Sequence, residues 1–240
     1  MSDWIALGRW PSGYVGYALS EGGGLTQASG ADAQEVLTAL NLPDALIMRI
    51  GEGDASSVPC AVLPGAGQVL PALSQVQPAD IISGWVRLWI AGYLEQHPDW
   101  DGIVCALHGD VTHWLHISAG EVVSCQSSLT QRLFAALNMA DATPDEHAIA
   151  DSLSRPERLA TQLRAAEVGG DGACALGHLI GAELAATRAY WLGQQVVVIG
   201  EGPMAAAYGA ALQGQGVPIE LAAANDVLAD GLAALGKVVC

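Results

Sequence analysis

The sequence predicts an α/β protein of two similar halves, each built as three strands followed by a helix. Two stretches carry this βββα order, and each has a glycine-containing turn between its first two strands. The first stretch begins at Trp4 and continues to a helix expected at 33–40; the second begins at Gly102 and continues to a helix at 129–137. Two halves of this kind predict two domains with a cleft between them, and paired turns that face the cleft.

The boundary between the halves is predicted near residue 98. Apolar residues recur at three- and four-residue spacing over 80–95, which predicts one long helix there. Pro98 ends this helix, and the strands of the second half begin four residues later. We therefore assign residues 1–98 to the N-terminal half and residues 99–240 to the C-terminal half.

The elements within each half follow from short apolar runs separated by turn residues. Strands of the first half are expected at 4–7, 14–19, 24–28 and 45–50, with a weaker one at 60–63. In the second half, hairpin turns are expected at 109–110 and 119–120, and helices at 143 onward, 154–167 and 173–191. The chain closes with strands at 195–199 and 217–221 and helices at 203–212 and 227–235, an alternation that predicts parallel strands covered by helices.

Composition excludes several classes of protein. The 240 residues contain 25 acidic and 9 basic side chains, a net charge of −16 that repels nucleic acid. No run of 18 apolar residues occurs, so no membrane span is expected. The start of the chain lacks the features of a secretory signal, and the five cysteines lack metal-ligand spacing. We expect a cytoplasmic protein with reduced thiols, a small-molecule partner and the possibility of a homodimer.

Lysine is almost absent from the chain. Lys237, four residues from the end, is the only one. Any phosphate that the protein binds must therefore be neutralised by arginine, histidine, backbone N–H groups or a metal ion.

The C-terminal part of the chain resembles a known enzyme family. The resemblance is good over roughly the last seventy residues and faint, though collinear, before them. The residues that carry it are Leu179-Ile-Gly-Ala-Glu-Leu184, Gly193-Gln-Gln195, Val198-Ile-Gly200, Tyr208, Ala211-Leu212, Asp226 and Gly231-Leu232. This pattern is similar to that of the 2-dehydro-3-deoxygalactonokinases.

The resemblance implies a fold and an activity. The implied fold is the actin-like or sugar-kinase (ribonuclease H-like) fold, with two βββα-type domains and a cleft between them. The implied reaction is phosphorylation of the 6-hydroxyl of a 2-keto-3-deoxy sugar acid, with ATP and Mg²⁺ as cofactors.

The N-terminal half and the second phosphate turn depart from the family pattern. Gly8 lies where the family has the aspartate that holds hydrated Mg²⁺, and Trp10 lies where it has a phosphate-turn glycine. The segment 83–88 keeps only the glycine of the family's Arg-Gly-Glu-Glu-Thr-Gln, and His113 replaces a lysine. The family's Thr-Gly-Glu falls on 130–132, which reads Thr-Gln-Arg here.

Five residues are candidates for phosphate or metal contact on this alignment. Gly109, Asp110 and Thr112 form the second turn, and Asp110 is our candidate catalytic residue. His113 lies at the lysine position. Arg9 could replace the missing phosphate cation, although an exposed hairpin arginine is the simpler interpretation.

Two further sites have alternative interpretations. Gly200 and Gly202 lie between a strand and a helix and could contact a nucleoside, or they could simply form a tight turn. Glu183 could face the cleft, or it could bind a buried partner within its own domain.

His113 and His116 point to opposite faces of a strand and cannot share an ion. His108 and Asp110 could converge at the turn, but surface or half-buried histidines are the simpler interpretation, and we predict no metal site.

Two functions are compatible with these residues. The first is a divergent 2-dehydro-3-deoxygalactonokinase-like kinase that uses ATP and Mg²⁺; its general base is unassigned, Asp80 and Asp110 being the nearest acids. The alternative is a non-catalytic pseudokinase that binds a sugar acid, a nucleotide or a protein partner. The altered motifs favour the alternative, and Trp10 and Trp85 could block the cleft.

Overall fold

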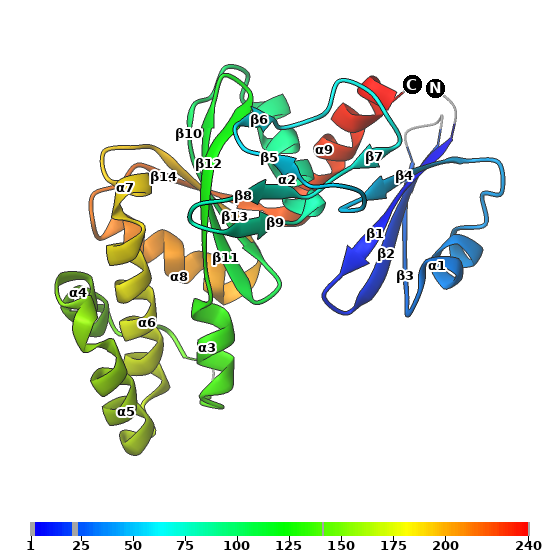
Figure 1. The fold of residues 1–240 in the computed structure, drawn as a ribbon. Helices are drawn as coiled ribbons and strands as arrows, with labels where there is room; N and C mark the ends of the chain where they lie inside the picture. Colours follow the sequence, from blue (N-terminus) through cyan, green and yellow to red (C-terminus); the bar gives the residue numbers. More distant parts are fainter. Residues whose placement is uncertain (1–2, 21–23, 141, 240) are drawn as a thin grey trace. The chain divides into compact units, whose positions relative to one another are not determined.

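The computed structural model describes residues 3–20, 24–140 and 142–239, drawn as a ribbon in Figure 1. The chain divides into two compact units, and we describe each by itself. The first unit holds residues 1–100, 118–124 and 224–240, and the second holds residues 101–117 and 125–223.

A five-stranded sheet forms the larger part of the first unit. Its order is β3 (Leu25–Gly30), β2 (Gly13–Leu19), β1 (Trp4–Trp10), β4 (Leu46–Ile50), β7 (Val69–Leu70). The first three strands are antiparallel, and β4 is parallel to β1. Ile5, Leu7 and Ala18 on one face pack against Val36 and Leu40 of α1 (Ala33–Leu40), which completes the predicted βββα order.

The predicted helix over 80–95 is wrong in its first residues. Residues Asp80–Ile82 form strand β9, which pairs with β8 (Leu73–Gln75), and β8 pairs in turn with β5 (Ser56–Ser57). The helix α2 begins only at Gly84, because the Ser83 hydroxyl caps its N-terminus by accepting from the Trp85 N–H at 3.3 Å. The helix ends at Gln96. Spacing alone missed this boundary because the short strand also carries apolar residues.

Helix α2 packs backbone to backbone against the last helix, α9 (Ala224–Val239). A Cβ atom added at Gly92 of α2 would lie 1.7 Å from the carbonyl oxygen of Val227, and one at Gly231 of α9 would lie 2.0 Å from that of Leu88. The two glycines therefore allow an approach that no other residue type permits. This packing assigns the C-terminal helix to the first unit.

The second unit is built on a sheet in which parallel and antiparallel strands meet. The order is β14 (Ile219–Ala223), β13 (Val196–Gly200), β10 (Gly102–His108), β11 (Val111–Ser118), β12 (Glu121–Ser128). Strands β13 and β14 run parallel to β10, while β11 is antiparallel to it. The predicted parallel strands at the end of the chain are confirmed. The first residues of β12 also pair with β6 (Cys60–Ala61) within the first unit.

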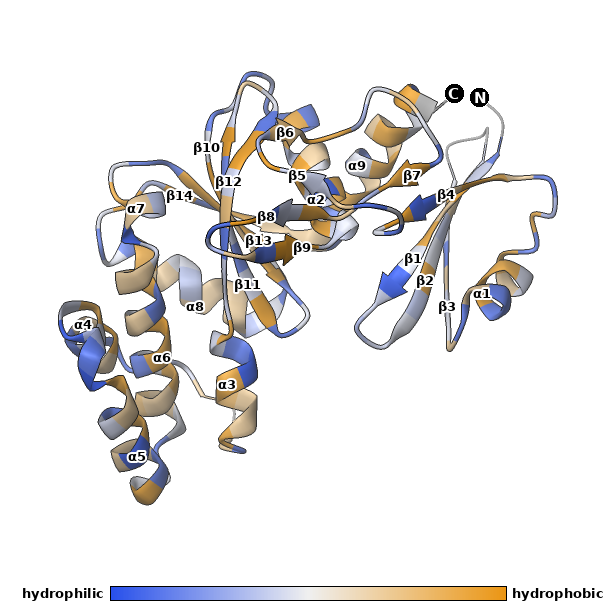
Figure 2. Ribbon diagram, viewed as in Figure 1, coloured by the Kyte–Doolittle hydropathy of each residue, from blue (hydrophilic) through white to orange (hydrophobic). Residues whose placement is uncertain are grey.

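Helices cover one face of this sheet and extend beyond it. They are α3 (Thr130–Ala136), α4 (Glu146–Ser154), a 3₁₀ turn at Pro156–Arg158, α5 (Leu159–Gly169), α6 (Gly172–Ala186), α7 (Arg188–Trp191) and α8 (Gly202–Gln213). In Figure 2, α4 and α5 show both hydrophilic and hydrophobic colours, as expected for helices with one buried face.

Two boundaries in this group differ from the prediction. Helix α4 is capped by Asp145, whose carboxylate accepts from the Ala148 N–H at 2.8 Å, rather than by Thr143. The predicted helix over 173–191 is interrupted at Thr187, whose hydroxyl donates back to the Glu183 carbonyl at 2.8 Å.

The compact units and the predicted halves agree near the first boundary and differ at the end of the chain. The first unit runs to Trp100, close to the predicted limit at residue 98, but it also includes 118–124 and 224–240. A division into domains at residue 98 stays a prediction. Within the described ranges, no helix is both long enough and apolar enough to cross a membrane.

The contact between α2 and α9 predicts a large effect of one methyl group. Gly92→Ala should lower the free energy of unfolding by about 3 kcal/mol, because the new Cβ collides with a backbone carbonyl that cannot move by itself. Urea denaturation followed by circular dichroism measures this. The control is Gly169→Ala in α5, where a Cβ meets nothing within 4 Å. It should leave stability unchanged or raise it by up to about 1 kcal/mol. Equal effects of the two substitutions would contradict the packing described.

Candidate functional site

The predicted phosphate turn joins β10 to β11 in the second unit. Gly109 has a φ of +66°, a left-handed conformation that favours glycine. Asp110 beside it is half-exposed and accepts two hydrogen bonds from Arg132 of α3, at 2.6 Å from Nε and 2.8 Å from Nη2. These hydrogen bonds hold the pKa of the Asp110 carboxyl below its usual value. The candidate catalytic residue is thus an ionised carboxylate already held by a guanidinium group.

Thr112, the next residue of the predicted site, lies inside the second unit. Its side chain is fully buried, and its hydroxyl lies 3.0 Å from the hydroxyl of Tyr208 on α8. The structure therefore does not bring the Thr112 hydroxyl to the surface of the turn together with Asp110. Its predicted contact with phosphate is not supported by this geometry.

Tyr208 leads to a buried carboxylate, Glu183 of α6. The Tyr208 hydroxyl donates to Glu183 at 2.6 Å, and the indole N–H of Trp114 on β11 donates to it at 2.7 Å. Thr130 of α3 provides a further side-chain hydrogen bond. Burial raises the pKa of the Glu183 carboxyl, and the three hydrogen bonds oppose that rise.

This network decides between the two interpretations of Glu183. The carboxylate is only 5% exposed and binds partners on α3, β11 and α8, all within the second unit. Glu183, Tyr208 and Trp114 are far apart in the sequence, and the first two belong to the pattern that resembles the family. Their shared role is to join three helices to the sheet.

His113, the predicted substitute for a lysine, carries no charge at neutral pH. Its ring is buried, and its Nδ1 lies 2.6 Å from the Ser127 hydroxyl. Burial lowers the pKa of His113 to about 3, and the neighbouring His108 contributes to that shift. Burial also lowers the pKa of His108 to about 4. A positive charge at this turn must therefore come from another side chain.

Gly200 and Gly202 lie in the connection between β13 and α8. A Cβ at Gly200 would lie 3.0 Å from the Cβ of Leu107 on the adjacent strand, so close packing favours glycine there. Gly202 has a φ of +66° and open space around its Cα. The tight-turn interpretation accounts for both residues, and it leaves the start of α8 accessible.

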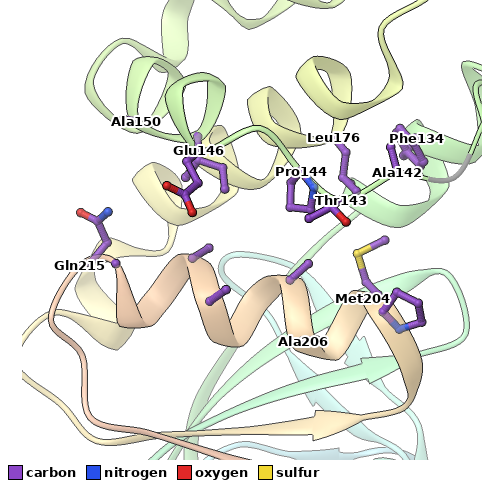
Figure 3. Close-up of a pocket in the computed structure, with 16 residues that line it drawn as sticks. Phe134, Ala142, Thr143, Pro144, Glu146, Ala150, Leu176, Met204, Ala206 and Gln215 are labelled. Atoms are coloured by element: carbon purple, nitrogen blue, oxygen red, sulfur yellow. The ribbon is translucent and has the colours of Figure 1, made fainter.

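A pocket of about 890 Å³ extends along α8 from this connection (Figure 3). Alanines of α8 form one wall, and residues of α3, α4 and α6 form the other. The lining residues are Phe134, Ala142, Thr143, Pro144, Glu146, Ile149, Ala150, Leu176, Pro203, Met204, Ala206, Ala207, Ala210, Ala211, Gly214 and Gln215. Glu146 is the one ionisable side chain among them.

This pocket was not predicted from the sequence. The segment from residue 143 onward was considered only as the start of a helix, and Ala211 was the one alanine of α8 considered, as part of the family pattern. The sequence feature that could have indicated the pocket is the run of small residues at 205–207 and 209–211, since small side chains on a helix leave space beside it.

In the first unit, Arg9 is exposed and interacts with its own hairpin. Its Nε donates to the Tyr14 hydroxyl at 3.2 Å, and its guanidinium carbon lies 5.5 Å from the centre of the Tyr14 ring. Gly8 beside it has no room for a side chain, because a Cβ would lie 2.4 Å from the Ile50 carbonyl oxygen. The family's aspartate could not be accommodated at this position without moving β4.

The two tryptophans near the first turn belong to an aromatic cluster within the first unit. Trp85 is fully buried, and its indole N–H donates to the Arg9 carbonyl at 2.7 Å. Trp10 meets Trp85 edge to face, with ring centres 5.8 Å apart. Trp85 is therefore a core residue of this unit.

Arg87 is a buried cation that serves the structure of the first unit. It is 2% exposed and donates to the carbonyl oxygens of Ala61, Val62 and Pro71 at 2.8–3.0 Å. All of these acceptors are neutral backbone groups, so Arg87 fixes the segment around them and does not face a ligand. Among the residues the structure describes, no group of three or more His, Cys, Asp or Glu side chains could hold a metal ion.

The Glu183 network predicts a pH-dependent cost of substitution. Glu183→Gln should lower the free energy of unfolding by about 1–3 kcal/mol, because an amide offers one acceptor to three converging donors. The pKa of Glu183 is raised above its ordinary value of 4.5, so its contribution to stability is greatest below pH 4.5 and falls as pH rises through the folded-state pKa. The difference between wild type and variant should therefore be larger at pH 4 than at pH 8.

Urea denaturation of both proteins at several pH values measures this difference. Glu157→Gln, at an exposed position of the 3₁₀ turn, is the control and should stay within about 0.5 kcal/mol of wild type. A difference that grows with pH would mean that the network favours the ionised form.

The fold of the chain was compared with those of solved protein structures. In fold it is similar to a candidate 2-dehydro-3-deoxygalactonokinase of Sinorhizobium meliloti, with a TM-score of 0.83, 19% sequence identity and 98% coverage of both chains. Component A of the (R)-2-hydroxyglutaryl-CoA dehydratase of Acidaminococcus fermentans gives a TM-score of 0.48, at 12% identity and 99% coverage of both chains. The ethanolamine utilization protein EutJ of Carboxydothermus hydrogenoformans gives 0.47, at 11% identity and coverage of 97% of this chain and 89% of that one.

The similarity to the Sinorhizobium meliloti structure confirms the predicted α/β fold of the actin-like and sugar-kinase group. No curated protein matches the chain in sequence. Residues 139–235 match the family model described as 2-keto-3-deoxy-galactonokinase, which covers the segment where the sequence analysis found the resemblance. Over these residues the chain is similar to the 2-keto-3-deoxy-galactonokinase family.

Proposed function

We propose that this protein is a 2-dehydro-3-deoxygalactonokinase-like protein that binds a nucleotide through its second unit. The reaction we propose is ATP-dependent phosphoryl transfer to the 6-hydroxyl of a 2-keto-3-deoxy sugar acid. The pocket along α8, beside Gly200 and Gly202, is the observation that carries the proposal. Its volume of about 890 Å³ lies in the range of small-molecule sites.

The chemistry of the pocket suits the nucleoside part of a nucleotide. Phe134, Pro144 and Met204 offer apolar surface to a base, while Thr143 and Gln215 offer polar groups. None of the described residues that line the pocket is basic, so the phosphate groups of a bound nucleotide would extend out of it. Gly200 and Gly202 would lie along that exit, where the nucleoside joins its phosphate groups, and their contact with the nucleoside stays a prediction from the sequence.

Magnesium would be needed to offset the charge of the phosphates in any transfer reaction. Asp110 is the carboxylate at the predicted phosphate turn, and a carboxylate with phosphate oxygens and water is a suitable ligand set for Mg²⁺. Arg132 holds Asp110 in the described structure, so Asp110 would have to release Arg132 before it could serve this purpose.

A non-catalytic role is the second candidate, and two observations favour it. Gly8 leaves no space for the family's metal-binding aspartate, and Asp110 is engaged by Arg132. A pseudokinase of this kind would bind a sugar acid, a nucleotide or a protein partner without turnover. A cytoplasmic location and a homodimer also remain predictions from the sequence.

Calorimetric titration with ATP, with and without Mg²⁺, tests the proposal. Binding that strengthens with Mg²⁺, followed by phosphorylation of a 2-keto-3-deoxy sugar acid, would support the kinase. Binding without phosphorylation would support the non-catalytic candidate. The absence of heat at millimolar ATP, on protein shown to be folded, would reject a nucleotide function altogether.

The pocket also predicts the effect of filling it. Ala206→Leu places a larger side chain on the exposed wall of α8 and should weaken adenosine binding by about tenfold or more, because it occupies volume that the base needs. Calorimetry with adenosine measures this loss. Ala165→Leu, an exposed position of α5 outside the pocket, is the control and should bind as wild type does. Unchanged adenosine binding in Ala206→Leu would exclude this pocket as the nucleoside site.

A further inference from the structure

The second unit has few cations, and only one of them lies at the predicted phosphate turn. Of the arginines and lysines that the structure describes there, all but Arg132 lie in the helical segment 155–188. Those four are Arg155, Arg158, Arg164 and Arg188. The nearby His113 is buried, and its Nδ1 lies 2.6 Å from the Ser127 hydroxyl, so its ring does not face the surface of the turn.

Arg132 is presented in the geometry that arginine uses for oxyanions. Its Nε and Nη2 bind the two oxygens of Asp110 at 2.6 and 2.8 Å, and its backbone N–H donates to the Asp110 carbonyl at 3.2 Å. This paired arrangement is the one a guanidinium group also forms with phosphate. Both side chains are more than half exposed, at 54% and 55%, so water competes for the pair and the pair is weak.

We infer that Arg132 is the phosphate-binding residue of this turn, and that the Asp110 carboxylate occupies its guanidinium group until a phosphate replaces it. The inference deepens the proposed function and rests on it, because the phosphate would be that of the nucleotide. It assigns to Arg132 the positive charge that a buried, neutral His113 cannot supply.

The exchange has a consequence for Mg²⁺. Once a phosphate binds the guanidinium group of Arg132, the released Asp110 carboxylate lies close to another negative charge in a strongly acidic protein. A divalent cation between the carboxylate and the phosphate would offset this repulsion. Wild type should therefore bind a polyphosphate more tightly with Mg²⁺ than without it, and the neutral Asp110→Asn should lose most of that dependence.

Sodium tripolyphosphate is the probe for the test, since it carries the phosphate chain without the nucleoside. Binding is measured by calorimetry and by phosphorus NMR at low ionic strength, with and without Mg²⁺. Arg132→Gln should weaken binding by about tenfold or more, because it removes a charge-assisted pair of hydrogen bonds. Asp110→Asn should tighten Mg²⁺-free binding by about two- to fivefold, because it removes an exposed competitor.

The controls separate charge from geometry. Arg164→Gln removes an arginine from a comparable exposed pair with Glu167 on α5 and should bind as wild type does. Arg132→Lys keeps the charge without the paired geometry and should fall between wild type and Arg132→Gln. Circular dichroism establishes that each variant is folded.

The outcomes distinguish this inference from the proposed function. Equal affinities of wild type and Arg132→Gln, or no binding even by Asp110→Asn, would overturn the role of Arg132. Adenosine is titrated separately: if it fails to bind while the tripolyphosphate results hold, Arg132 remains assigned and the nucleoside pocket is rejected. If adenosine binds but Arg132→Gln does not change the affinity for tripolyphosphate, the pocket remains the proposed nucleoside site and this inference is wrong.

Discussion

The arrangement of the second unit depends on one buried carboxylate. Burying a carboxyl group without a cation is costly, and hydrogen bonds from Trp114, Tyr208 and Thr130 offset that cost for Glu183. Each donor comes from a different element, so the carboxylate can be satisfied only when β11, α3 and α8 are all in place around α6. The start of α8, and with it one wall of the pocket, is held in position relative to the sheet by this requirement.

Close contact between backbones is a second constraint, and it recurs in both units. Gly92 and Gly231 bring α2 and α9 together, and Gly177 and Gly181 of α6 bring α4 close: a Cβ on either would lie within 2.5 Å of a carbonyl oxygen. Gly181 belongs to the Leu179–Leu184 segment that resembles the family, so part of that resemblance reflects helix packing. Part of a family signature can therefore be maintained by folding without any contact with substrate.

Charge distinguishes this chain from an ordinary phosphate-binding protein. Basic groups are few, and the described structure holds several of them in structural roles. Arg87 binds backbone carbonyls, Arg155 at the end of α4 pairs with Asp151 of that helix, and Arg164 pairs with Glu167 within α5. Gly109, with its positive φ, forms the turn that the sequence predicted. The two charged side chains at this turn, Asp110 and Arg132, neutralise each other. The turn therefore has the predicted backbone geometry, but its charged groups differ from those of the family pattern.

Local pattern in the sequence predicted most of the longer strands and most of the helices, because alternation, helical spacing and turn residues act between neighbours in the chain. The βββα order of both halves, the Gly109–Asp110 turn and the parallel strands β13 and β14 all followed from it. Tertiary structure decided the rest. Asp80–Ile82 became a strand because β8 was available to pair with it, and the last helix joined the first unit because Gly231 meets Gly92. The contacts around Glu183 and the pocket along α8 bring together residues that are far apart in the sequence. Thr112 and Tyr208, whose hydroxyls are in contact, are 96 positions apart. No local pattern records such contacts, since they exist only when distant elements pack together.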